Sequence, residues 1–241
     1  MKLLSALSSA DLAALALFAL CWVGYEPLLK RLAGRGAHSI NSHMAVLRTR
    51  WMRNMAGREN RFLDSQLLGH ALNSASFFVS ANLIVMAAAA GTLFGGATAL
   101  RGVASAPLIV QGPQILLEAK FALVVAVLGR SLLSFIWAIR QMNYCLAAVG
   151  AAPEPSADPA MLKAYGDASA SVLNPALSSF SAGVRGYYFA LAAGSWLLGP
   201  LAFALVTAGA VALLVWRQWG SGSADGIRRL REILERSSPQ P

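Results

Sequence analysis

The sequence predicts an all-α, polytopic membrane protein with four transmembrane helices and a long cytoplasmic helical extension before the second. Three observations predict this fold class. Of the 241 residues, 56% are apolar and only 13% are charged, which lies outside the usual composition of soluble domains. Four apolar stretches approach or exceed the ~20 residues needed to cross a bilayer. The basic residues lie just outside these stretches, where they set topology and meet anionic lipid headgroups.

The four expected spans are residues 12–29, 71–94, 115–139 and 187–216. Four helices of this length make one compact bundle, so we expect residues 1–219 to form a single domain. The first span is expected to be retained rather than cleaved as a signal peptide, because only Lys2 supplies positive charge before it and no small-x-small cleavage site follows it. Residues 220–241 are expected to form a short amphipathic tail, with Arg228–Glu232 and Arg231–Glu235 paired at i,i+4 spacing.

The loop between the first two spans is expected to be cytoplasmic, because it is strongly basic. Its basic residues are Lys30, Arg31, Arg35, Arg48, Arg50, Arg53, Arg58 and Arg61, against the acidic Glu59 and Asp64. The protein is therefore expected in the bacterial inner membrane, with its N-terminus outside and with residues 30–70 and 140–186 in the cytoplasm.

The last apolar run is broken at Gly199-Pro200 and is either a kinked helix or a hairpin. Two arms of about fifteen residues would fall short of the ~20 needed to span a bilayer. We therefore expect one kinked helix and an outside tail, although the basic tail favours the cytoplasm. Before this run, Asp158-Pro159 reads as an N-cap with the first helical residue, and Asn174-Pro175 reads as a second such pair.

Residues 44–64 are predicted to form an amphipathic helix along the membrane surface, at ~100° per residue. One stripe contains Met44, Leu47, Trp51, Met55 and Phe62, and the opposite side contains Arg50, Arg53, Arg61 and Asp64. Arg48, Arg58 and Glu59 lie on or beside the apolar side. Their side chains either snorkel away from it or are buried against a partner, because a charge at an apolar interface has to be paired. The candidate partner or lipid contacts are Arg48, Trp51, Arg58, Glu59 and Arg61.

The same helical phase continues into the second span as a polar face with Gln66, His70, Asn73 and Ser80. Within hydrocarbon such side chains must face protein or water. They either form hydrogen bonds between helices or line a passage or ligand pocket.

Arg130 lies near the middle of the third span, where a charge costs ~2.5–3.5 kcal/mol on insertion scales and indicates function by default. Lys120, Arg130 and Ser134 share one helical face. The carboxylates of Glu26, Glu59 and Glu118 do not obviously reach Arg130. Its partner is then a bound anion, a lipid phosphate, a water-filled cavity or the backbone carbonyls of a broken helix near Gly199-Pro200.

The chemistry-bearing residue types make no enzyme motif. The cysteines Cys21 and Cys145 do not suggest a disulfide framework, and His38, His43 and His70 do not complete a metal site with them. There is no glycine-rich phosphate loop and no hydrolase or metalloprotease motif in the sequence. We expect no enzymatic activity and no cofactor.

Several segments resemble a known family. Residues 48–64 read Arg-x-Arg-Trp-Met-x-x-Met-x-x-Arg-x-Asn-Arg-x-x-Asp, and residues 135–143 read Phe-x-Trp-x-x-Arg-x-x-Asn. Together with Arg185-x-Tyr187-Tyr188-Phe189 and Trp196-x-x-x-Pro200, they resemble the bacterial multi-pass membrane proteins catalogued as domain of unknown function 599. The resemblance covers most of the chain up to about Trp219, and Gln141 departs from it where an aromatic residue is expected. It implies a four-helix bacterial membrane protein and no particular activity.

Two functions fit the sequence. The first is a homo-oligomeric channel or transporter unit with an anion-accepting pathway between the second and third helices, lined by Gln66, His70, Asn73, Ser80, Lys120, Arg130 and Ser134. The alternative is a membrane scaffold or lipid-binding protein that acts through the basic helix of residues 44–64. The expected partners are the bilayer, anionic headgroups and further copies of the chain. Nucleic acid is not expected, because the net charge of +9 comes from residues that flank the spans.

Overall fold

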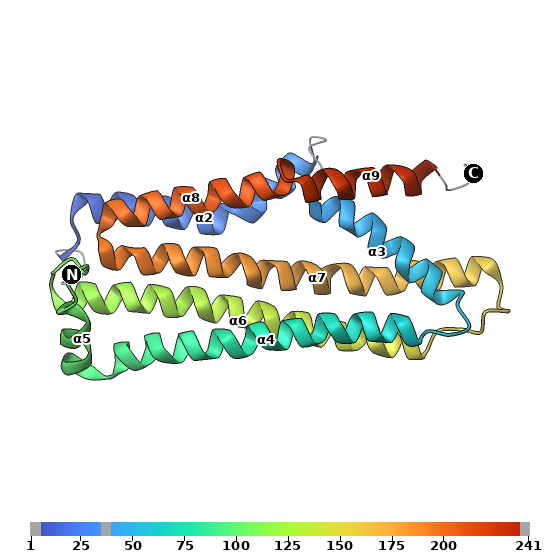
Figure 1. The fold of residues 1–241 in the computed structure, drawn as a ribbon, viewed down its shortest axis with the longest axis horizontal. Helices are drawn as coiled ribbons and strands as arrows, with labels where there is room; N and C mark the ends of the chain where they lie inside the picture. The colour runs from blue at the N-terminus through green and yellow to red at the C-terminus, as the bar shows by residue number, and fades with distance from the viewer. Residues whose placement is uncertain (1–5, 35–39, 237–241) are drawn as a thin grey trace. The chain divides into compact units, whose positions relative to one another are not determined.

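A computed structural model of the chain describes residues 6–34 and 40–236, and these residues form helices and connections without a strand. The helices are α2 (Ser9–Gly34), α3 (Ile40–Ala56), α4 (Phe62–Phe94), α5 (Gly96–Ala104), α6 (Gln114–Gly150), α7 (Pro159–Ser195), the 3₁₀ turn η1 (Trp196–Leu198), α8 (Pro200–Trp219) and α9 (Gly222–Arg236) (Figure 1). The predicted all-α class is confirmed. Arg35 and His38, on which the sequence interpretation partly drew, lie outside the described residues.

Four stretches of the described chain are long and apolar enough to cross a membrane: Ser9–Leu28, Phe62–Phe94, Gln114–Gly150 and Pro200–Arg236. The second and third contain the predicted spans 71–94 and 115–139, and the first covers all of the predicted span 12–29 except its last residue. The helices are longer than the predicted spans: α4 has 33 residues, and α6 and α7 have 37 residues each. At 1.5 Å per residue each exceeds the ~30 Å of a hydrocarbon core, so part of each helix lies beyond it.

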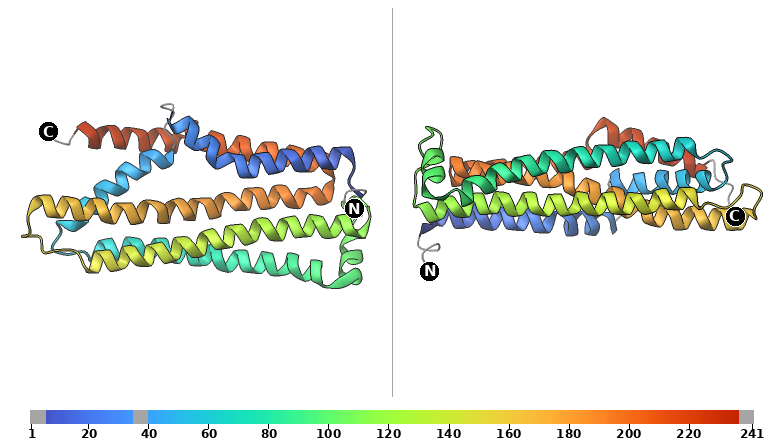
Figure 2. Two further views of the ribbon diagram at one scale, coloured as in Figure 1. Left: turned by 180° about the vertical axis from the view of Figure 1, so that it is seen from behind. Right: turned by 90° about the horizontal axis from the view of Figure 1, so that it is seen from below.

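The predicted kinked helix over residues 187–216 is wrong, because the chain reverses there. α7 ends at Ser195, and α8 returns beside it in the opposite direction (Figures 1 and 2). Gly199 makes the turn with φ 113°, a conformation that favours glycine, and its N–H donates to the Trp196 carbonyl at 3.0 Å. The hairpin has long enough arms because α7 begins at Pro159 and continues through Pro175.

Of the two predicted helix starts, Asp158-Pro159 and Asn174-Pro175, the structure contains only the first. Asp158 does act as an N-cap, since its carboxylate accepts the Met161 N–H at 3.1 Å, and Pro159 is the first residue of α7. The prediction of a second helix start at Asn174-Pro175 is wrong, because Pro175 lies inside α7.

A helical extension before the second span is present, but it is not continuous with that span. α3 ends at Ala56, and α4 begins at Phe62, whose N–H bonds to the Asn60 side chain at 2.9 Å. Asn60 is thus a local cap that starts a new helix. For this reason the helical phase predicted for residues 44–64 ends at Ala56. The polar face of the second span therefore does not continue the phase of α3, and Glu59 is not aligned with that face.

The chain divides into two compact units. Unit 1 comprises Met1–Lys30, Ser80–Leu133 and Gly183–Leu214, and unit 2 comprises Arg31–Val79, Ser134–Ala182 and Val215–Pro241. The core of unit 1 is aromatic, with Phe18, Phe189, Trp196 and Phe203 in mutual contact. The core of unit 2 is formed by side chains of α3, α4, α6 and α7, which include Met52, Met55, Leu68, Cys145 and Leu173. The single domain expected over residues 1–219 stays a prediction.

Candidate functional site

Unit 1 contains a buried polar cluster around Trp196. The Trp196 indole N–H donates to Asp11 Oδ1 at 2.8 Å, and the Ser8 hydroxyl donates to Asp11 Oδ2 at 2.7 Å. The Lys120 ammonium lies 5.9 Å from the centroid of the Trp196 ring and interacts electrostatically with Asp11. Lys120 is only 3% exposed and Asp11 only 6%. The predicted binding residue Lys120 is therefore buried beside an aromatic face, in the same cluster as the Asp11 carboxylate.

Two further cations of unit 1 lie against aromatic rings. Arg185 donates to Glu26 at 2.8 Å and lies 5.9 Å from the Tyr25 ring centroid. Arg130 is exposed and lies 5.8 Å from the Trp22 ring centroid. Glu26 is thus directed to Arg185, a pairing that the sequence interpretation did not consider. The exposure of Arg130 places its charge on the surface of unit 1.

The polar face predicted for the second span is on the outside of α4. Gln66, His70, Asn73 and Ser80 are all exposed. The buried side of this helix instead carries Asp64, Leu68, Ala75 and Asn82. Ser134 is half-buried on α6. Four of the seven predicted pathway residues are thus on the exposed side of α4, and the pathway itself stays a prediction.

The basic segment of unit 2 is organised around the carboxylate of Asp64, at the beginning of α4. Asp64 is completely buried, and its Oδ1 accepts the Trp51 indole N–H at 2.6 Å and pairs with Arg58 Nη1 at 2.5 Å. The second oxygen, Oδ2, is buried and has no hydrogen-bond partner among the described residues. Trp51 and Arg58 are therefore bound within the chain, and Asp64 is not on the solvent side where the helical phase had put it.

Arg61 connects the segment between α3 and α4 to the loop between α6 and α7. Its guanidinium donates to the carbonyls of Met55, Ala56, Ala152 and Pro153. Cations at a helix C-terminus neutralise its exposed carbonyls, which explains why α3 ends where it does. Glu59 is exposed in this connection, and no interaction of its side chain with a described residue is present. Of the predicted contacts, Glu59 alone keeps the exposure that a partner contact needs.

α3 runs antiparallel along the first part of α7 and is fixed there at both ends. Near its start, the Asn41 side-chain amide donates to Ser178 Oγ at 3.2 Å. Near its end, Arg53 makes two bonds to Asp167, of 2.5 Å and 3.0 Å. Gly166 permits this approach, since a Cβ there would lie 2.5 Å from the Arg53 Cα. The helix is thus packed on protein, and it is not the free surface helix that its amphipathic pattern predicts.

Arg48, also predicted as a contact, is half-buried on the side of α3 that packs inward. Its Nη1 donates to the Asn41 side chain at 3.3 Å, and its Nε is buried without a hydrogen-bond partner among the described residues. Burial lowers the pKa of the Arg48 guanidinium. A guanidinium begins so far above neutral pH that it remains charged.

α9 also packs against α3 within unit 2. Arg231 of α9 contacts His43 Nδ1 at 3.3 Å and pairs with Glu235 at 2.7 Å, as the i,i+4 pattern predicts. Arg228 pairs with Asp225 at 2.8 Å instead of the predicted Glu232. The contact brings the tail helix beside α3, the helix that precedes the second span. The expectation of a tail outside the membrane stays a prediction.

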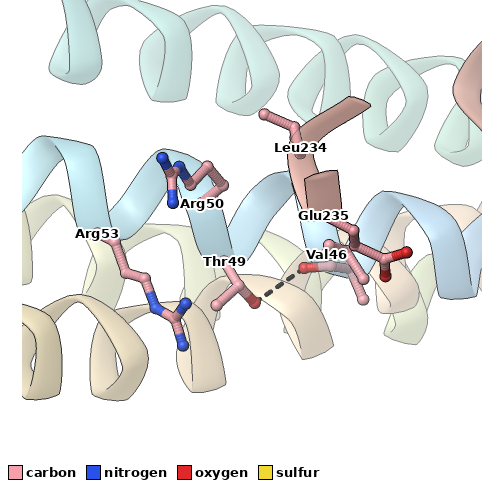
Figure 3. Close-up of a pocket in the computed structure, with 7 residues that line it drawn as sticks. Val46, Thr49, Arg50, Arg53, Leu234 and Glu235 are labelled. Carbon is pink, nitrogen blue, oxygen red and sulfur yellow. Dashed lines mark hydrogen bonds between the residues drawn. The ribbon is translucent and has the colours of Figure 1, made fainter. Parts of the chain in front are cut away.

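A groove of about 360 Å³ lies between α3 and α9 (Figure 3). Residues from both helices line it, namely Ala45, Val46, Thr49, Arg50, Arg53, Leu234 and Glu235. The Thr49 hydroxyl donates to the Ala45 carbonyl at 2.9 Å, drawn as the dashed line in Figure 3. Arg50 makes no hydrogen bond or ion pair with any described residue. The groove thus combines apolar side chains with one guanidinium whose donors are available.

Sequence reasoning did not find this groove or the Asp11–Trp196 bond. Arg50 and Leu234 are 184 positions apart, and no local pattern indicates that their helices meet. The amphipathic pattern of residues 222–236 indicates that the apolar side of α9 is covered by another surface. It does not indicate which part of the molecule provides that surface. Trp196 and Asp64 were part of the motifs that suggested a family, although no role followed from them.

The fold and these sites define a helical integral membrane protein with a basic, structured region built from α3 and α9. The chain belongs to the family described as "Protein of unknown function, DUF599", whose pattern matches residues 13–223. This confirms the resemblance found in the sequence. No curated protein and no solved structure matches the chain.

Proposed function

We propose that this protein is an anchor in the bacterial inner membrane that binds anionic phospholipid at its cytoplasmic face through α3 and α9. The observation that carries the proposal is the packing of α9 on α3, which joins two basic helices from opposite ends of the chain. Of the two functions that fit the sequence, the lipid-binding one is favoured, because four of the seven predicted pathway residues lie on the exposed side of α4 and Lys120 of α6 is buried in the cluster around Trp196.

The hairpin of α7 and α8 supports a cytoplasmic position for both basic helices. If α7 crosses the membrane beside α8, the chain has five crossings, and an N-terminus outside leads to α3 inside. The same count brings the end of α8 back inside, together with α9. The basic loop and the basic tail then both obey the positive-inside rule, which the four-crossing arrangement did not allow.

The balance of charges supports an anionic ligand. Arg53, Arg58, Arg228 and Arg231 each have a carboxylate partner within unit 2. Arg50, Arg229 and Arg236 have no ion pair with any described residue. Basic side chains near an anionic leaflet contribute about 1 kcal/mol each.

α9 also presents apolar side chains beside these charges. Leu230 and Ile233 are 51% and 61% exposed, on a side of the helix that does not face α3. Arg229 and Arg236 flank them in the sequence. An exposed apolar stripe with basic neighbours is typical of helices that lie in the headgroup region.

The proposal is tested by following α9 in nanodiscs. An environment-sensitive fluorophore is attached to Ile233→Cys, in a background with Cys21→Ala and Cys145→Ala. We expect its emission to shift to shorter wavelength when phosphatidylglycerol replaces part of the phosphatidylcholine. The shift should be lost in Arg229→Glu/Arg236→Glu and retained in the control Lys163→Glu, an exposed charge of α7 in the same unit. Identical emission in both lipid mixtures would contradict the proposal.

A homo-oligomeric transporter is the second candidate, and the exposed charge of Arg130 favours it. Arg130 is exposed within a candidate span, a position where a second copy of the chain or a water-filled pathway between copies would meet its charge. The test is anion flux into liposomes. Equal flux through the parent and an Arg130→Ala variant would remove this candidate, and a loss of flux with an unchanged oligomer in native mass spectrometry would support it.

A further inference from the structure

We infer that the groove between α3 and α9 is a binding site for the phosphodiester group of one anionic phospholipid, and that Arg50 binds the phosphate. The inference rests on the proposed function and deepens it, since it names the site and the chemical group that the site takes. It depends on three properties of the groove: its charge, its donors and its apolar walls.

The groove carries one positive charge that nothing in the described chain balances. Three of its lining residues are charged, and two of these are neutralised by partners: Arg53 pairs with Asp167, and Glu235 pairs with Arg231. Arg50 remains. A ligand with a single negative charge therefore completes the balance, and a phosphodiester has that charge at neutral pH. A phosphomonoester or inorganic phosphate carries between one and two charges at neutral pH, more than the single charge of Arg50 balances.

The donors of the groove suit a phosphate. The planar guanidinium of Arg50 has five N–H groups and can bind two phosphate oxygens at once. The Thr49 hydroxyl already donates to the Ala45 carbonyl, so its oxygen is left to accept a hydrogen bond. A headgroup hydroxyl, as in phosphatidylglycerol, can donate to it. This gives a physical reason to prefer that headgroup to a choline headgroup, which has no donor and has a positive charge.

The remaining lining is apolar and fits the part of a lipid next to its headgroup. Ala45 and Val46 of α3 and Leu234 of α9 complete the groove. Its volume of about 360 Å³ lies at the lower end of ligand pockets, enough for one headgroup but not for a whole lipid. The exposed Leu230 and Ile233 of α9 are the side chains proposed to enter the bilayer surface, which would bring the lipid to the groove.

The experiment uses the full-length chain purified in detergent and measures ligand binding by native mass spectrometry. The probes are dihexanoyl phosphatidylglycerol, dihexanoyl phosphatidylcholine and sodium phosphate. We expect one tightly bound phosphatidylglycerol and much weaker binding of the other two probes. Arg50→Ala should weaken phosphatidylglycerol binding about tenfold or more, as expected from the loss of a charge-assisted bidentate contact. Arg50→Lys should bind with intermediate affinity, and the control Lys163→Ala should match the parent.

Three results would overturn the inference: equal binding of the two lipids, equal binding of inorganic phosphate, or unchanged affinity in Arg50→Ala. Arg50→Gln provides a second variant of similar volume if the alanine variant does not purify as the parent does. The two proposals fail separately. If the Ile233 probe responds to phosphatidylglycerol while Arg50→Ala binds it as well as the parent does, the surface interaction stands and the groove is not the site.

Discussion

The indole N–H of Trp51 donates a 2.6 Å hydrogen bond to Oδ1 of Asp64, a carboxylate that is completely buried and that also pairs with Arg58. The bond joins the last turns of α3 to the first turn of α4 across the connection at residues 57–61. A buried charge is tolerated when it is paired and hydrogen-bonded, and Asp64 has both kinds of partner. This relationship holds in place the helix on which the proposed lipid site depends.

Removing the Asp64 carboxylate should destabilise unit 2. Asp64→Ala leaves the Trp51 N–H without its acceptor and Arg58 without its carboxylate, and we expect a loss of about 2–4 kcal/mol, typical of a broken buried pair. Asp64→Asn keeps an acceptor for Trp51 and should lose less. The measurement is the melting temperature in detergent, followed by size-exclusion chromatography. Glu59→Ala, an exposed carboxylate nearby, is the control and should melt as the parent does.

Gly166→Ala should separate α3 from α7. The added Cβ would lie 2.5 Å from the Arg53 Cα, so backbone has to move and the Arg53–Asp167 pair is strained. We expect faster proteolysis at the connection between α3 and α4. Gly69→Ala is the matched control, because a Cβ at that helical glycine of unit 2 meets nothing within 4 Å, and it should be neutral or slightly stabilising. Equal protease resistance of the two variants would mean that α3 is not held at this point.

The buried pair of Asp11 and Lys120 should show coupling in a double-mutant cycle. Each single change, Asp11→Asn or Lys120→Met, leaves the other charge buried beside Trp196, and we expect a clear fall in melting temperature. The double variant removes both charges and should melt closer to the parent than the two single effects add up to. Additive effects would show that the two charges act independently. Glu118→Gln serves as the control, because Glu118 is half-buried and its carboxylate accepts a hydrogen bond from the exposed Gln114 side chain.

The α7–α8 hairpin makes a prediction about sidedness. In a background with Cys21→Ala and Cys145→Ala, single cysteines replace Gly57, Ser223 and Leu108. An impermeant maleimide added to spheroplasts should label Leu108→Cys at once and label Gly57→Cys and Ser223→Cys only after lysis. Labelling of Ser223→Cys together with Leu108→Cys would restore the kinked helix that crosses once.

Local pattern was sufficient where a structural feature depends on neighbouring residues. The three spans within α2, α4 and α6 follow from the length of their apolar runs, and the start of α7 follows from the Asp158 cap. The i,i+4 pair of Arg231 and Glu235 was also predictable, because both residues lie on one face of one helix. The family could be suggested as well, because each of its motifs is a short run of neighbouring residues.

Local pattern failed where several conformations fit the same residues. A run broken at Gly199-Pro200 fits a kink and a hairpin equally well, and only the packing of α8 on the end of α7 decides between them. The helical phase of residues 44–64 was misleading beyond Ala56, because α3 ends there and the Arg61 guanidinium binds the Ala56 carbonyl at its end together with the Ala152 carbonyl of a distant loop. The polar stripe from Gln66 to Ser80 is real, but a stripe does not say which side of a helix is buried.

By itself, the sequence determined that this chain is a helical membrane protein of a particular family, because hydrophobic length and short motifs are properties of contiguous residues. The tertiary structure decided which charges are neutralised and which are left. Asp64 and Glu26 find their partners 6 and 159 positions away, in Arg58 and Arg185, and Asp11 accepts from Trp196, 185 positions away. Arg50 is left available in a groove between two helices from opposite ends of the chain. Such pairings depend on packing in three dimensions, since charges interact through space and not along the sequence.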